Sequence, residues 1–231
     1  MNLPYPLLAD AWYWLAWGVW LPWFAWALCR APWRCFLEKP GRSHVWLGMI
    51  VVLMLVWSLK AGVKPGLDLH LTGIVLFTLA FEPPLAIVGL NLVLSGLTLN
   101  GVIAWQAFAL NALMTAGVGV ALAHGIHRLV DRFLPCHFFI FLFLKGFFGS
   151  AMTVICIGLG FTLLYGLSET YAFPYLMEEY LPYYLLLGFS EAWLSGMALT
   201  LMLVYASGWV ATFDDAVYLN DGARRGGGKT D

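Results

Sequence analysis

Long apolar stretches with few charges constrain this chain more than any other feature of its sequence. They cover residues 7–28, 45–59, 71–99, 102–123, 138–164 and 181–205. A helix needs about 20 predominantly apolar residues to cross a bilayer. Only 11% of the residues are charged, whereas about 25% is usual for a soluble domain. The sequence therefore predicts an integral membrane protein of the all-α class, a polytopic transmembrane helical bundle.

The stretch at residues 71–99 is too long for one simple span and contains the sequence Phe81-Glu82-Pro83-Pro84. Proline donates no backbone hydrogen bond and disfavours helix in the residue before it. We therefore expect two short helices, 70–81 and 84–99, that meet at a turn. The bundle then has about seven spans with one Pro-broken pair, and the spans belong to a single transmembrane domain at 1–210 followed by a tail at 211–231.

Basic residues set the expected orientation, because cytoplasmic loops are enriched in Lys and Arg. With seven spans, the basic connectors at 30–44 and 124–137 and the tail fall on one side of the membrane. We therefore expect a multi-pass protein of the inner (plasma) membrane, with the N-terminus outside and the C-terminus in the cytoplasm. The bilayer is its expected surroundings, and a net charge of −1 argues against nucleic acid as a partner.

One candidate site lies on the predicted outer side. The amine of Met1 and the loop at 66–70, which ends in His70, fall on this side. An amine and a neutral imidazole are nitrogen ligands that suit nickel, cobalt or copper. His70 would open a helix at the membrane surface, so its replacement should affect folding little. The alternative is that His70 only caps that helix or lies at the interface.

A second group of possible ligands lies in the loop at 124–137 and comprises His124, His127, Cys136 and His137. Zinc accepts such ligands, but the spacing matches no standard zinc site. Haem ligation by the histidines, in a membrane redox enzyme, is a further alternative.

Lys145 and Glu191 are charged residues placed well inside apolar spans. Counted from the predicted span ends, Lys145 lies about 12 Å deep from one side and Glu191 about 15 Å deep from the other. In a core of about 30 Å they reach a similar level. Because an isolated charge is costly in hydrocarbon, we expect them to pair. The alternative is that Lys145 extends toward the cytoplasmic headgroups and that Glu191 is protonated or faces a wet cavity.

The order of these landmarks resembles the CbiM/NikM family, the substrate-specific membrane subunits of energy-coupling-factor (ECF) cobalt and nickel ABC importers. The start of the chain, MNLPYPLLADAWYWLAWGVWLPWFAWALCRA, is similar to the family's N-terminus and first helix. PGLDLHLTGIVLFTLAFEPPLAIVGLNLVL resembles its loop histidine followed by a short helix, a break and another helix. ALNALMTAGVGVAL resembles an Asn- and Ala-rich helix, and GFSEAWLSGMALTLMLVY resembles the last helix. Together these stretches extend over most of the chain.

The resemblance implies a ligand set for a divalent metal. In the family the metal is held by the N-terminal amine, the backbone nitrogen and histidine side chain of residue 2, and the loop histidine. Met1 and His70 match this pattern, whereas residue 2 is Asn2, which offers an amide oxygen in place of an imidazole. Asn111 matches an asparagine behind the site, and Phe108 stands where the family has a second one.

The resemblance also implies a function. The chain would be the substrate-binding permease subunit of an energy-coupling-factor ABC importer, with cobalt or nickel as substrate, no covalently bound cofactor and no enzymatic activity. Its partners would be a transmembrane coupling subunit and ATPase subunits. The alternative is a structural or assembly membrane protein that keeps the fold but has lost metal transport.

Overall fold

A computed structural model describes residues 3–38, 40–59, 61–62, 64 and 66–219 of the chain. The helices in chain order are α1 (Asp10–Arg30), α2 (Trp33–Leu37), α3 (Pro40–Ser58), α4 (Ile74–Leu99), α5 (Trp105–Ala112), η1 (Leu113–Gly117), α6 (Val118–Phe133), α7 (Phe138–Ile140), η2 (Phe141–Phe148), α8 (Gly149–Leu167), α9 (Phe173–Glu179), α10 (Leu181–Ala206), η3 (Ser207–Trp209) and α11 (Asp215–Tyr218). Two short strands, β1 (Ala61–Gly62) and β2 (Asp68–Leu69), pair antiparallel, with Ala61 opposite Leu69.

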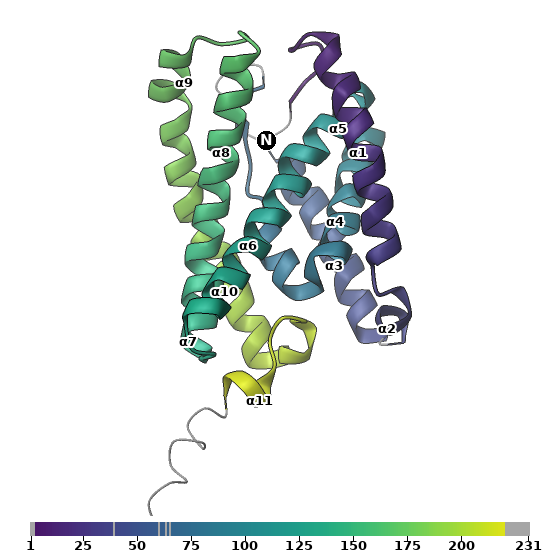
Figure 1. The fold of residues 1–231 in the computed structure, drawn as a ribbon, viewed down its shortest axis with the longest axis vertical. Coiled ribbons are helices and arrows are strands. Elements are labelled where there is room, and N and C mark those ends of the chain that lie inside the picture. The colour runs from purple at the N-terminus through teal and green to yellow at the C-terminus, as the bar shows by residue number, and fades with distance from the viewer. Residues whose placement is uncertain (1–2, 39, 60, 63, 65, 220–231) are drawn as a thin grey trace, which may run out of the picture.

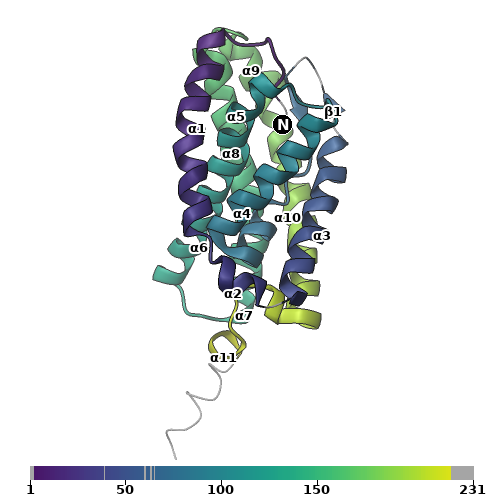
Figure 2. The ribbon, with the colours of Figure 1, turned by 90° about the vertical axis from the view of Figure 1, so that its right-hand side faces the viewer.

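The long helices lie side by side along the long axis of the molecule (Figures 1 and 2). One end, called the β end, carries the β1–β2 ladder and α9; the other, called the tail end, carries α2, α7 and α11. Five helical segments are long and apolar enough to cross a membrane: Gly41–Ser58, Ile74–Leu99, Trp105–Phe133, Phe138–Leu167 and Phe173–Trp209. At 21 residues, α1 also has the length of a crossing.

The break in α4 is where the sequence predicts it. Glu82 has φ 64° and ψ 161°, outside the helical region, and is followed by Pro83 and Pro84. A Cβ placed on Gly89 would lie 2.6 Å from the ring of Phe77, although in a straight helix these residues would be about 18 Å apart. The segments 74–81 and 83–99 are therefore two arms that fold back on each other. Together with α1, and with these arms as separate passes, the crossings agree with the predicted count of about seven.

The two prolines leave two carbonyl groups without their helical donors. In a continuous helix the N–H of residue 83 would bond the carbonyl of Leu79, and that of residue 84 the carbonyl of Ala80. Pro83 and Pro84 have no N–H to give. Water is absent from a bilayer core, so carbonyls freed there need donors from the protein.

Residues just beyond α10 supply these donors. Thr212 donates to the Leu79 carbonyl through its N–H at 3.3 Å and its hydroxyl at 2.8 Å. Ala211 N–H donates to the Ala80 carbonyl at 3.0 Å, where Arg42 Nη2 also lies at 3.4 Å. Residues 211–212 therefore close the open end of the first arm, although they are more than a hundred positions away in sequence.

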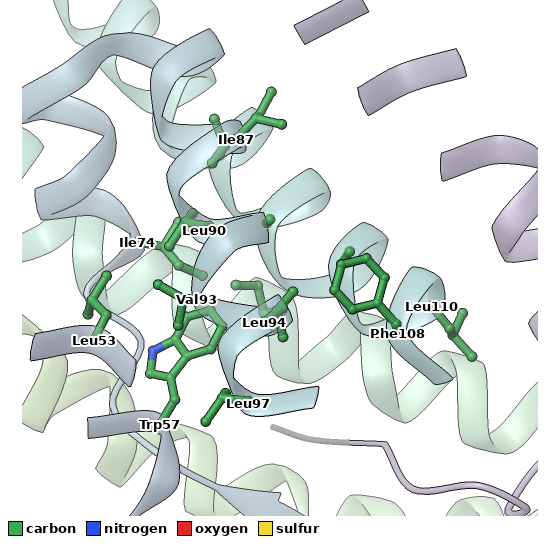
Figure 3. Packing of buried hydrophobic residues seen from close by; sticks show 14 of the residues in the cluster. Leu53, Trp57, Ile74, Ile87, Leu90, Val93, Leu94, Leu97, Phe108 and Leu110 are labelled. Atoms are coloured by element: carbon green, nitrogen blue, oxygen red, sulfur yellow. The ribbon is translucent and has the colours of Figure 1, made fainter. Parts of the chain in front are cut away.

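The core is built around α4. In the most apolar stretch of α4, 78% of the residues are buried, compared with 22% in that of α3. Helix α4 is therefore central and α3 peripheral. Figure 3 shows how the second arm contributes Leu90, Val93, Leu94 and Leu97 to this core, beside Trp57 of α3. A smaller apolar cluster at the tail end includes Val210, Phe213 and Tyr218.

Two segments are helical where the sequence suggests polar loops. The residues from His124 to Phe133 continue α6, and α9 lies within the connector before α10. In the first case Ile126, Leu129, Val130 and Phe133 recur at helical spacing, so the segment is an amphipathic helix and its charges occupy one face. The division at residue 210 stays a prediction; residues 211–219 pack on the bundle, and 220–231 lie outside the described residues.

Candidate substrate site

The beginning of the chain is held inside the bundle by Asn111. This side chain, on α5, accepts a hydrogen bond from Leu3 N–H at 2.8 Å and donates one to the Leu3 carbonyl at 3.0 Å. It also donates to the Ala107 carbonyl at 2.9 Å. Leu3 is 1% exposed and Asn111 0%. Met1 and Asn2, two of the predicted ligands, lie outside the described residues and immediately precede this anchored position.

Tyr13 of α1 folds the next residues back onto the helix. Its hydroxyl donates to the Pro4 carbonyl at 2.9 Å and accepts from the N–H groups of Leu7 at 3.1 Å and Leu8 at 3.2 Å. One phenol therefore satisfies three backbone groups that no helix serves. Residues 3–8 are consequently an ordered segment with a defined path.

The loop that leads to His70 packs directly against this segment. Gly66 has φ +81°, and a Cβ at this position would lie 2.4 Å from Leu7 Cδ2 and 3.2 Å from Pro4 Cδ. Tyr165 of α8 donates a hydrogen bond to the Gly66 carbonyl at 2.6 Å. Only glycine fits both this left-handed conformation and the close approach. The structure thus brings residues 3–8 and the loop at 66–70 together.

His70 itself is buried and does not open a helix. Its side chain is 4% exposed, β2 ends at Leu69, and α4 begins only at Ile74. The ring centroids of His70 and Trp57 are 5.0 Å apart. The prediction of a surface position at a helix start is therefore wrong, because the chain continues into the bundle as non-helical backbone before α4 begins. That His70 can be replaced with little effect on folding stays a prediction.

The tautomer of His70 follows from its hydrogen bond. Nδ1 lies 3.0 Å from the Leu71 carbonyl, an acceptor, so Nδ1 carries the proton. Nε2 then holds the lone pair that a metal ion can use. His70 also contributes to the wall of a groove of about 620 Å³ lined by α3, residues 69–71 and α10.

Glu191 and Trp57 bind the backbone that follows His70. The Glu191 carboxylate accepts from Thr72 N–H at 2.7 Å, from Gly73 N–H at 2.6 Å and from the Ser195 hydroxyl at 2.9 Å. Trp57 Nε1 donates to the Thr72 carbonyl at 3.0 Å. Sequence reasoning missed these roles. The signal in the sequence was Gly73, which directly precedes α4 and has no side chain to cap the N–H groups at the helix start.

Lys145 does not pair with Glu191, so that prediction is wrong. Lys145 is 2% exposed, and its amine contacts the carboxylate of Asp131 and donates to the Tyr218 hydroxyl at 2.8 Å. Burial, with the Asp131 charge second, raises the pKa of Tyr218, which remains a neutral donor. The physical reason is that the long lysine side chain extends to the tail end. Glu191 already accepts hydrogen bonds from two backbone N–H groups and the Ser195 hydroxyl.

The residues of the predicted loop at 124–137 do not form a joint site. The rings of His124 and His127 are 6.3 Å apart between centroids, and His127 lies 3.4 Å from a carboxylate oxygen of Asp131. His137 caps α7 by accepting from Phe139 N–H at 3.2 Å, and its ring stacks on Phe139. Among the described residues, no three His, Cys, Asp or Glu side chains are grouped to hold a metal.

A family profile described as the cobalt uptake substrate-specific transmembrane region, CbiM, matches residues 2–209. The chain belongs to the CbiM family. The match covers the anchored N-terminal segment, the His70 loop, both arms of α4 and α10, as the resemblance implies. A CbiM-family chain is a membrane component of metal transport, which is not a class of enzyme.

Two solved structures have the same fold as this CbiM-family chain. One is a truncated transition metal transporter, 16% identical, with a TM-score of 0.74, 89% of this chain covered and 99% of the other. The second is a transition metal transporter, 15% identical, with a TM-score of 0.74, 88% of this chain covered and 93% of the other. No curated protein sequence matches the chain. At such identities the structures bear on the fold alone.

Proposed function

We propose that this chain is the substrate-binding membrane subunit of an energy-coupling-factor ABC importer for a divalent transition metal ion such as cobalt or nickel. The observation that carries the proposal is the double hydrogen bond between Asn111 and the backbone of Leu3. It anchors the chain directly after Met1 and Asn2, in a segment that packs against the loop ending in His70. Residues far apart in sequence thereby become candidates for one ligand set.

In this proposal the metal ligands are the amine of Met1, the backbone nitrogen and side chain of Asn2, and Nε2 of His70. Nitrogen donors of this kind suit nickel and cobalt, and the Nδ1–H bond to the Leu71 carbonyl orients the imidazole. Asn111 supports the site from behind by holding Leu3. Because Asn2 supplies an oxygen where an imidazole would bind more strongly, the affinity for these metals should be moderate.

The distribution of basic residues supports an N-terminus outside and a C-terminus in the cytoplasm. Arg30 ends α1, Arg42 lies near the start of α3, and Arg128 and Arg132 lie in the last turns of α6. These positions are at the tail end, which the positive-inside rule assigns to the cytoplasm. A transmembrane coupling subunit and ATPase subunits would therefore act from the tail end, and the substrate would enter from the β end.

Titration calorimetry of the purified full chain with Ni²⁺ and Co²⁺ tests the proposal. Wild type should bind, and His70→Ala should lose binding while thermal unfolding shows that it is still folded. His44→Ala is the matched control, because His44 is an exposed histidine near the start of α3, at the opposite end of this helix from the loop. Equal binding by wild type and His70→Ala would reject the site, and an absence of binding in wild type would favour a structural or assembly role.

Two changes at the N-terminus test the other ligands. Asn2→His should increase the affinity for nickel by about tenfold, because it adds an imidazole beside the amine. A tag fused before Met1 should weaken binding far more than a tag fused after Asp231. Equal binding by both tagged forms would remove the amine from the ligand set.

A further inference from the structure

The backbone between His70 and α4 has polar groups that need hydrogen-bond partners from other parts of the protein. Residues 70–73 belong to no helix and lie within the bundle, where Thr72 is 1% exposed. Non-helical backbone at membrane depth is tolerated only when the protein itself satisfies its polar groups. The N–H groups of Thr72 and Gly73 both bind Glu191, and the Thr72 carbonyl binds Trp57. Side chains from two other helices therefore define the path of this segment.

Glu191 is well suited to hold this backbone. It is 1% exposed, and burial of an unpaired carboxylate would be very costly. Its oxygens instead accept from two backbone N–H groups and one hydroxyl, directly before the N-terminus of α4. The partial positive charge at a helix N-terminus adds to the stabilisation of this anion. Glu191, whose position is fixed by the long helix α10, therefore determines where residues 72–73 lie.

His70 lies two residues before the first of these anchored groups. Trp57 connects them further, because its ring packs on the His70 ring at 5.0 Å while its Nε1 binds the Thr72 carbonyl. A displacement of Thr72 would therefore change both the backbone that carries His70 and the ring that supports it.

We propose that Glu191 is a positioning residue for the substrate: by fixing Thr72 and Gly73 it sets the direction in which His70 presents Nε2. The proposal rests on the metal site of the preceding subsection. In this proposal Glu191 is not a ligand, because its oxygens already accept hydrogen bonds from Thr72 N–H, Gly73 N–H and the Ser195 hydroxyl. Metal affinity therefore depends on a carboxylate in α10 that is not a ligand.

Glu191→Gln is the diagnostic change, because it keeps the size of the side chain. Glutamine has one acceptor oxygen and an NH₂ group, which would face an N–H group of Thr72 or Gly73 as a second donor. One backbone bond is lost and the segment must shift. We expect Ni²⁺ and Co²⁺ to bind at least about tenfold more weakly, which corresponds to about 1.4 kcal/mol.

Two matched variants control for other effects. Glu179→Gln makes the same substitution at an exposed position of α9, and Lys145→Met removes a buried charge at the tail end. Both should bind metal within about twofold of wild type. Glu191→Asp keeps the charge but shortens the reach, so it should lose an intermediate amount of affinity. Wild-type affinity in every folded Glu191 variant would overturn the proposal.

A second measurement distinguishes positioning from loss of stability and needs no metal. NMR of the full chain with nitrogen-15 in its histidine rings reports the tautomer of each ring. The signals of His70 are identified as those that are missing from the spectrum of His70→Ala. Glu191→Gln and Glu191→Asp should shift or broaden these signals, whereas Glu179→Gln and Lys145→Met should not. Unchanged His70 signals in folded Glu191 variants would reject the positioning role.

The two experiments also separate the two proposals. If wild type binds no metal, or His70→Ala binds like wild type, the proposed substrate site fails, while the NMR comparison still tests whether Glu191 positions His70. If His70 is required for binding but the Glu191 variants match wild type in affinity and in the NMR spectrum, the positioning proposal alone fails.

Discussion

At the β end, the first arm of α4 begins where two backbone N–H groups donate to the Glu191 carboxylate; at the tail end, it stops where two carbonyls accept from Ala211 and Thr212. Both ends lie inside the bundle and both have backbone groups that the helix leaves unsatisfied. A helix start has surplus donors and needs an acceptor, which a side chain supplies. A helix end has surplus acceptors and needs donors, which residues 211–212 supply through their backbone N–H groups and the Thr212 hydroxyl.

The difference has a consequence for function. The β end is held by a side chain on the middle of a long helix, a rigid support of the kind that a binding site needs. The tail end is held by a short segment whose attachment depends on Val210, Phe213, Tyr218 and the Lys145 contact. We therefore expect changes at the tail end to lower stability and to leave metal affinity nearly unchanged, and changes at the β end to affect affinity.

The largest effect is expected for a chain that ends at Val210. Removal of the remaining residues exposes the cluster around Phe213 and Tyr218 and leaves the Leu79 and Ala80 carbonyls without Thr212 and Ala211. Stability should fall by more than about 3 kcal/mol, measured by thermal unfolding in detergent. Metal affinity measured well below the unfolding temperature should change less than about threefold. A larger loss of affinity would show that the two ends of the arm are coupled.

Replacement of Lys145 by methionine should cost about 1–2 kcal/mol, because the Asp131 carboxylate and the Tyr218 hydroxyl lose their shared donor. The cost is moderate because Asp131 is 36% exposed and water can solvate it. Thermal unfolding would measure the change. The double variant with Tyr218→Phe should lose less than the sum of the two single variants, and full additivity would contradict the shared contact.

Gly73→Ala tests whether metal affinity depends on the backbone after His70, and it leaves the side chains of His70, Trp57 and Glu191 unchanged. Gly73 has φ +61°, and a Cβ there would lie 2.7 Å from Leu53 Cδ2. The left-handed conformation costs about 1–2 kcal/mol for alanine, and relief of the contact with Leu53 must displace the segment after His70. Calorimetry should therefore show weaker metal binding.

Gly101→Ala is the matched control for this change. Gly101 has φ +72°, with nothing within 4 Å of its added Cβ. Its alanine variant should lose similar stability through backbone strain alone and keep full metal affinity. Equal affinity of the Gly73 and Gly101 variants would contradict the assignment of substrate binding to the segment between His70 and α4.

The smallest effect is expected for Thr212→Val, which removes the hydroxyl bond to the Leu79 carbonyl and keeps the shape of the side chain. Stability should fall by about 1 kcal/mol. Thr200→Val is the comparison, because the Thr200 hydroxyl bonds the Gly196 carbonyl one turn earlier in its own helix. Thr200→Val should change the unfolding midpoint less, and the reverse order would argue against the role of residue 212.

Much of the fold could be predicted from local sequence. The apolar stretches place the long helices to within a few residues, and Glu82-Pro83-Pro84 locates the break in α4 because proline lacks a donor wherever it occurs. His70 was a candidate ligand from its chemistry and its predicted position, whereas Asn111 was identified by the resemblance alone. The ligand assignment stays a prediction, since Met1 and Asn2 lie outside the described residues, although Asn111 does hold the adjacent Leu3.

The sequence by itself determined that this chain crosses a membrane about seven times and turns back at Glu82, because hydrophobicity and the missing proline donors act locally. Only the tertiary structure decided the partners of the buried charges. Sequence counting gave Lys145 and Glu191 a similar depth, but it could not give the direction in which each side chain points around its helix. Glu191 binds Thr72 and Gly73, and Lys145 binds Asp131 and Tyr218, because a buried charge pairs with the groups that long-range packing places within its reach.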